Sequence, residues 1–158
     1  MAQRETRRFD PRTLVVGFIA GMAFGMMEMV IEALIGMGFW APLRFIASVF
    51  TLGRDTDPSF SLMPVFVGLM GHMMNSVIFS IVFGLFVSRL ASGVVGLAIL
   101  GMVYAAAIFV VMWYVVLPLI DPAMLLVNAG GFFASHLLYG LVLGVGIALV
   151  RQRSSVAA

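Results

Sequence analysis

Four long apolar stretches dominate this sequence: residues 13–38, 64–88, 94–117 and 123–150. Together they contain only two charged side chains, Glu28 and Glu32. Each stretch has the roughly 20 residues that a helix needs to cross a hydrocarbon core about 30 Å thick. Charged residues make up 10% of the chain, whereas soluble domains carry about 25%. This excludes a soluble globular domain, and we expect an all-α integral membrane protein, a four-helix transmembrane bundle.

The distribution of arginine predicts that both termini are cytoplasmic. If the four spans alternate in direction, most arginines fall on the side of the termini: Arg4, Arg7, Arg8, Arg12, Arg89, Arg151 and Arg153. Only Arg44 and Arg54 fall on the opposite side. Short cytoplasmic segments carry the excess of basic residues in multi-pass proteins. The first apolar stretch is too long for a signal peptide, so we interpret it as an uncleaved span.

The one long connection, residues 39–63, is predicted to contain a short interfacial helix in the first outer loop. Its first half is apolar but too short to cross the bilayer, and it includes Trp40 and Arg44, residue types that anchor at headgroup depth. We place this helix at residues 42–52. No other segment has the composition of a linker, and residues 1–158 are therefore expected to form a single transmembrane domain.

Length and composition also exclude several functions. Four spans leave no room for a catalytic domain outside the membrane, and the chain has no nucleophile–base motif or phosphate-binding loop, so we expect no enzyme. Cysteine is absent, which excludes thiolate metal sites and leaves the redox compartment undetermined. The net charge is only +2, and no nucleic-acid partner is expected.

Polar side chains in the spans are predicted to form a layer inside the bundle. The glycine stripe of the first span leads to Glu28 and Glu32, which places both glutamates on the side facing other helices. Counted from the outer ends of the spans, His72, Asn75 and His136 lie at a depth similar to that of Glu28. This polar layer is the candidate site.

The layer has a structural interpretation and three functional alternatives. In the structural one, a glutamate and a histidine hydrogen-bond each other and fix helix register, while Glu32 pairs with Arg44 at the interface. His72 and His136 could instead supply both axial nitrogens of a b-type haem. Copper could bind Glu28, His72 and His136 together with nearby methionines. A proton or ion conduit is the last alternative. The sequence therefore does not determine whether a cofactor binds or which one.

Residues 38–44, the Gly71-His72 helix and residues 134–140 resemble a group of small, uncharacterised four-helix bacterial inner-membrane proteins. The resemblance covers most of the chain and implies this fold and a bacterial inner-membrane location. It implies no chemistry.

The expected function is that of an accessory or structural subunit of an inner-membrane assembly, or of a homo-oligomer. The chain has glycine-rich packing faces, no soluble domain and no complete catalytic set. Its expected partners are the lipid bilayer and either another membrane protein or further copies of itself.

Overall fold

The computed structural model describes residues 10–53 and 56–156, and within these ranges it contains helices and no strand. The elements in chain order are α1 Arg12–Leu34, α2 Ala41–Ser48, η1 Val49–Thr51, α3 Leu62–Leu85, η2 Val87–Leu90, α4 Gly93–Val111, the π-helical turn η3 Met112–Val116, α5 Leu117–Ile120, η4 Pro122–Leu126 and α6 Ala129–Val156. The all-α prediction is confirmed. Four helical segments are long and apolar enough to cross a membrane: Arg12–Leu34, Leu62–Leu90, Gly93–Ile120 and Ala129–Arg153.

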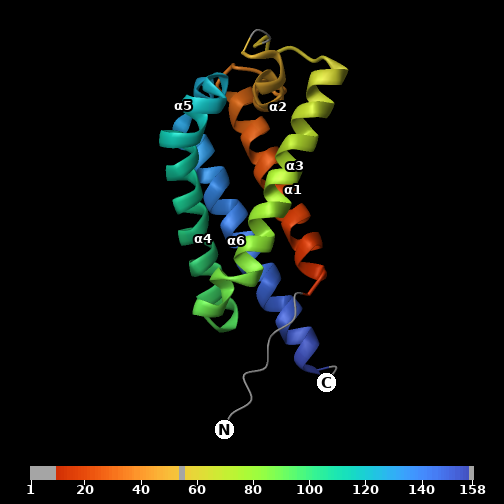
Figure 1. Ribbon diagram of the computed structural model, residues 1–158, viewed down its shortest axis with the longest axis vertical. Coiled ribbons are helices and arrows are strands. Elements are labelled where there is room, and N and C mark those ends of the chain that lie inside the picture. Colours follow the sequence, from red (N-terminus) through yellow and green to blue (C-terminus); the bar gives the residue numbers. More distant parts are fainter. Residues whose placement is uncertain (1–9, 54–55, 157–158) are drawn as a thin grey trace.

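The four long helices stand side by side, and their connections divide between two ends of the bundle (Figure 1). Residues 35–53, 56–61 and 121–128 form what we call the loop end. The start of α1, the η2 turn and the end of α6 form the terminal end. Arg12, Arg89 and Arg151 lie at the terminal end, whereas Arg44 lies in α2 at the loop end. Arg4, Arg7, Arg8 and Arg54, which also entered the topology prediction, are outside the described residues.

Two helix boundaries differ from the predicted spans. The first helix stops at Leu34 because the chain turns at Gly36 and Gly38, whose φ angles of 87° and 116° favour glycine. The last helix begins at Ala129, after a 3-10 turn over residues 122–126. The Oδ1 atom of Asn128 accepts a hydrogen bond of 2.9 Å from the Gly131 amide, which is an N-cap interaction.

Small residues allow the helices to approach closely, as the glycine stripes predicted. In α4, a Cβ atom added to Gly101 would lie 2.1 Å from the carbonyl oxygen of Gly140 in α6. In α1, a Cβ atom at Gly17 would lie 2.1 Å from the Ser80 Oγ of α3. These glycine faces therefore hold α4 against α6 and α1 against α3, and they are used within the chain.

The short helix α2 lies where an interfacial helix was predicted, but protein surrounds it. Seven of its eight residues are buried, including Arg44. A Cβ atom at Gly68 of α3 would lie 1.9 Å from the Leu43 carbonyl oxygen, so α2 rests directly on α3. The sequence correctly indicated an apolar helix too short to cross. It did not indicate that the helix would cover the loop end of the bundle.

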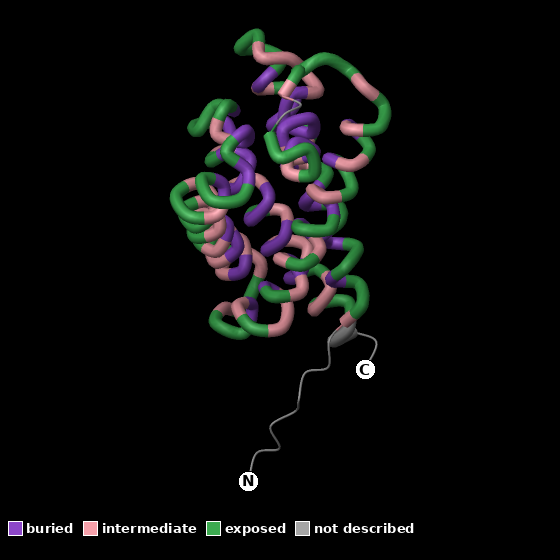
Figure 2. Tube along the Cα trace, turned by 45° about the horizontal axis from the view of Figure 1, so that its top comes forward, coloured by how far each residue is buried: buried purple, intermediate pink, exposed green. Residues whose placement is uncertain are grey.

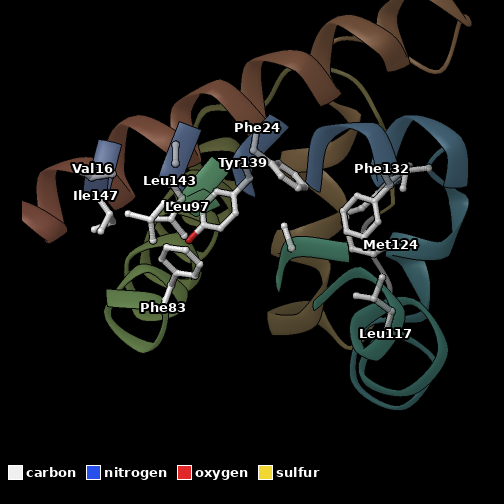
Figure 3. Packing of buried hydrophobic residues seen from close by; sticks show 14 of the residues in the cluster. Val16, Phe24, Phe83, Leu97, Leu117, Met124, Phe132, Tyr139, Leu143 and Ile147 are labelled. Carbon is white, nitrogen blue, oxygen red and sulfur yellow. The ribbon is translucent and has the colours of Figure 1, made fainter. Parts of the chain in front are cut away.

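Buried residues line the inner faces of the long helices, whereas their outer faces are exposed (Figure 2). Toward the terminal end the interior is filled by Phe83, Leu97 and Leu143, each at most 1% exposed. Leu117, Met124 and Phe132 form another buried group near the loop end, with Phe24 between the two groups (Figure 3). Buried apolar side chains therefore run along the interior of the bundle from the terminal end to the loop end.

Candidate functional site

A cavity of about 510 Å³ lies in the loop half of the bundle. Its walls come from α3 on one side and from α4, η3 and α5 on the other, with side chains of α1 and α6 between them. Residues of α2 and η1 cover the loop end of the cavity. The Tyr104 hydroxyl donates to the Phe79 carbonyl at 3.0 Å and joins α4 to α3 at the terminal end of the cavity.

The cavity reaches the outer surface of the bundle. Four of its lining residues are exposed, namely Phe50, Met74, Asn75 and Ile120. They belong to η1, α3 and α5, at the side where α3 and α4 diverge toward the loop end (Figure 1). The opening is therefore in the side of the helix bundle.

Four of the five residues in the polar layer predicted from the sequence line this one cavity. Glu28 of α1, His72 and Asn75 of α3 and His136 of α6 all contribute to its lining. Glu32 does not, because it lies one turn nearer the loop end of α1. Three helices thus bring the predicted side chains together, as their depths indicated.

Both glutamates are buried, with Glu28 1% and Glu32 0% exposed. The Ser135 hydroxyl donates to Glu28 Oε2 at 2.8 Å, while Glu28 Oε1 has no hydrogen-bond partner among the described residues. Glu32 Oε1 accepts a 2.6 Å hydrogen bond from the Asn128 amide. Glu32 therefore fixes the end of α1 to the start of α6.

Glu32 and Arg44 were expected to pair, but each contacts a different group in the structure. Arg44 Nε donates to the Asp57 carbonyl oxygen at 2.7 Å, in the connection that precedes α3. The physical reason is the fold of α2, which buries Arg44 on the side of this connection while Glu32 faces the segment before α6.

Backbone carbonyls hold both imidazoles. His72 Nε2 lies 2.8 Å from the Gly21 carbonyl oxygen, and His136 Nδ1 lies 2.8 Å from the Phe132 carbonyl oxygen. A carbonyl oxygen only accepts, so these two nitrogens are the donors. In a neutral ring the remaining nitrogen is an acceptor, which is Nδ1 in His72 and Nε2 in His136. The fold therefore assigns a tautomer to each histidine.

Phe24 packs against both imidazole rings. Its ring centroid is 5.0 Å from that of His72 and 4.8 Å from that of His136. A haem held by both histidines needs its macrocycle between the rings, and this would require Phe24 to move. The arrangement does not favour the haem alternative.

The copper and conduit alternatives also receive no support. Among the described residues, no three histidine, aspartate or glutamate side chains are grouped so as to hold a metal ion. Of the methionines near Glu28 and His72 in the sequence, Met26 and Met70 are 50% and 54% exposed, whereas Met74 lines the cavity. A conduit would have to pass the terminal half, which Phe83, Leu97 and Leu143 fill.

Asn75 is a polar side chain without a partner. It lies near the middle of α3, it is exposed at the mouth of the cavity, and it makes no hydrogen bond within the part of the chain that the structure describes. A polar group left unpaired in hydrocarbon costs several kcal/mol. In a membrane-inserted bundle, the carboxamide of Asn75 would therefore need a partner from outside the chain.

Three polar residues of the site were not singled out from the sequence. Ser135 binds Glu28, Tyr139 donates from α6 to the Ser76 carbonyl at 2.6 Å, and Asp121 lines the cavity near its cover. A signal for the first two was present, because Ser135 and Tyr139 are four residues apart and share a helix face beside His136. Asp121 gave none, since it lies in the connection between the third and fourth predicted spans and not within a span.

A hydrogen bond to Asp121 stabilises α2 in its position over the loop end of the cavity. The Ser48 hydroxyl donates to Asp121 Oδ1 at 3.2 Å. Burial raises the pKa of Asp121 to about 6, although hydrogen bonds from Ser48 and from the Met124 amide oppose the rise. Asp121 therefore binds its proton more tightly in the folded protein than an exposed aspartate does.

Comparisons with known proteins assign neither a family nor a function to this chain. No protein-family model matches the chain, and no curated protein or solved structure matches it either. The site is therefore defined by its own features: four apolar helices that surround a side-opening cavity with a polar interior.

Proposed function

We propose that this chain is a multi-pass protein of the bacterial inner membrane that holds a membrane-soluble ligand in its cavity. In this proposal it acts as an accessory subunit of a larger assembly, or as a homo-oligomer, and has no catalytic activity of its own. Both termini are cytoplasmic, as the positive-inside rule indicates. The observation that carries the proposal is the side-opening cavity with Glu28, His72, Asn75 and His136 in its lining.

The cavity has the properties of a small-molecule site. Its volume of about 510 Å³ is within the 300–1,000 Å³ that is usual for ligand pockets. Most of its lining residues are apolar, and a few polar groups converge from several helices, which is the composition of a site that orients one ligand. Because the opening faces sideways from helices of membrane-spanning length, such a ligand enters from the bilayer.

The outer faces of the bundle bear on the proposed accessory role. The glycine faces of α1, α4 and α6 are used inside the bundle, so contacts with a partner require other surfaces. The outer faces of α3 and α4 are available, with Phe66, Met70, Val95 and Val103 between 54% and 72% exposed. We assign the partner contact to these faces.

Native mass spectrometry tests the proposal. The protein is purified in mild detergent or in nanodiscs, and the mass of the intact particle is measured together with any bound small molecule. Ile108→Trp fills the cavity, since Ile108 lines it. Ile99→Trp is the matched control, because Ile99 is on the same helix, outside the lining and 53% exposed.

We expect a particle heavier than one chain that retains a lipophilic molecule, and we expect Ile108→Trp but not Ile99→Trp to lose that molecule. A monomer that retains nothing, or a molecule that survives Ile108→Trp, would overturn the proposal.

A further inference from the structure

The hydrogen-bond donors of the cavity are largely engaged by the protein itself. His72 Nε2 and His136 Nδ1 donate to backbone carbonyls. The hydroxyl hydrogens of Ser76 and Tyr139 do the same, toward the carbonyls of His72 and Ser76. Four polar lining residues therefore have their N–H or O–H groups occupied.

What remains for a ligand is a set of acceptors. His72 Nδ1 and His136 Nε2 have no hydrogen-bond partner among the described residues, and in neutral rings both accept. Glu28 Oε1 is a further buried oxygen without a partner in the described ranges. Asn75 offers the amide N–H groups that are still free. A ligand that donates hydrogen bonds matches this set.

The charges and shapes of the lining residues further restrict the chemical class of the ligand. The described lining residues include no arginine, so nothing in the cavity pairs with a phosphate or carboxylate head group. Phe24, Phe79 and Phe132 line the cavity beside the two imidazoles. Such aromatic surfaces favour a flat ring.

We propose that the cavity binds an uncharged ring that carries hydroxyl groups and an apolar tail, the chemistry of a reduced membrane quinone. The ring hydroxyls donate to His72 Nδ1 and His136 Nε2, and the tail leaves through the side opening past Met74 and Ile120. This inference rests on the proposed function, because it specifies the ligand of the same cavity. It concerns binding alone and includes no electron transfer.

Equilibrium binding of three probes to the full chain in nanodiscs tests the proposal. The probes are decylhydroquinone, decylbenzoquinone and decanol. The first two differ by two electrons and two protons, so that only the hydroquinone oxygens carry hydrogen, and the third has a hydroxyl group without a ring. The hydroquinone is kept reduced with dithionite under anaerobic conditions, which the chain tolerates because it has no cysteine.

We expect decylhydroquinone to bind about tenfold more tightly than decylbenzoquinone, since two donated hydrogen bonds are lost in the oxidised ring. Decanol should bind more weakly than decylhydroquinone. Asn75→Leu should weaken decylhydroquinone severalfold, whereas Ile78→Leu, an apolar change on the outer face of the same helix, should leave it unchanged. His136→Ala should reduce the preference for the reduced ring.

Equal affinity for the two rings, or decanol binding as tightly as the hydroquinone, would overturn the ligand assignment. The comparison of the two rings needs no variant, so a His136→Ala protein that fails to fold does not remove the test. If native mass spectrometry finds another molecule lodged in the cavity while these rings bind equally, the proposed function stands and this inference fails. If nothing occupies the cavity and no probe binds, both fail.

Discussion

Helices α4 and α6 approach closely at Gly101, and Gly101→Ala should destabilise this crossing. The new Cβ atom would lie 2.1 Å from the Gly140 carbonyl oxygen, an approach that real Cβ atoms do not make. The contact is with backbone, so the two helices must separate. Overpacking of this kind costs about 1–3 kcal/mol, which corresponds to a melting temperature lower by roughly 3–10 °C for a chain of this size.

Gly96→Ala is the matched control in the same helix. Its Cβ atom would lie 3.6 Å from the Ala91 Cβ, an ordinary van der Waals contact. Alanine favours a helix over glycine by up to about 1 kcal/mol, so this variant should be as stable as the parent protein or slightly more stable. Thermal unfolding of both variants in one detergent, followed by circular dichroism, gives the comparison. Equal melting temperatures for the two variants would refute the close approach of α4 to α6.

Three further predictions concern the polar contacts and the topology. Ser135→Ala leaves Glu28 Oε2 without its hydrogen-bond donor and should lower the free energy of unfolding by about 1–3 kcal/mol. Ser92→Ala, at an exposed position, should have little effect on the free energy of unfolding. Equal effects of the two substitutions would contradict the Glu28 contact. Because burial raises the pKa of Asp121 to about 6, the folded protein binds this proton more tightly than the unfolded chain, and stability should fall as the pH rises from about 4 to 6. Asp121→Asn should flatten this fall in thermal unfolding measured across that range, and an unchanged pH profile would contradict it. Cysteines introduced at Ser59 and Ala158 should react with a membrane-impermeant label from opposite sides of the membrane, and reaction from one side would defeat the topology.

The sequence predicted those parts of the structure that depend on single helices. Apolar length indicated four long helices, and the depth of Glu28, His72, Asn75 and His136 indicated one layer. In the structure these four side chains line one cavity. Each prediction needed only the position of a residue along its own helix, which the period of 3.6 residues and the rise per residue provide.

The contacts between helices could not be predicted, because they depend on which helices pack together and no single helix determines this. Glycine stripes indicated that α1 and α6 each pack closely against another helix, but they did not indicate which one. The contact of α6 with α4 at Gly101, and that of Ser80 in α3 with Gly17 in α1, could not be predicted. The burial of α2 is a similar case, because an apolar helix of this length can lie on lipid or on protein. The partner of Glu32 depended on where α6 begins, and this boundary was set by the turn before Asn128.

The most direct measurement is to locate a bound ligand by photolabelling. Decylhydroquinone carrying a diazirine at the start of its tail is bound to the protein in nanodiscs and irradiated, and the modified residues are identified by mass spectrometry. We expect adducts on cavity residues of α4 and η3, chiefly Ile108 and Met112, that are suppressed by excess unmodified decylhydroquinone. Equal labelling of the exposed residues Val95, Ile99 and Val103 on the outer face of α4, without suppression, would contradict a ligand site in the cavity.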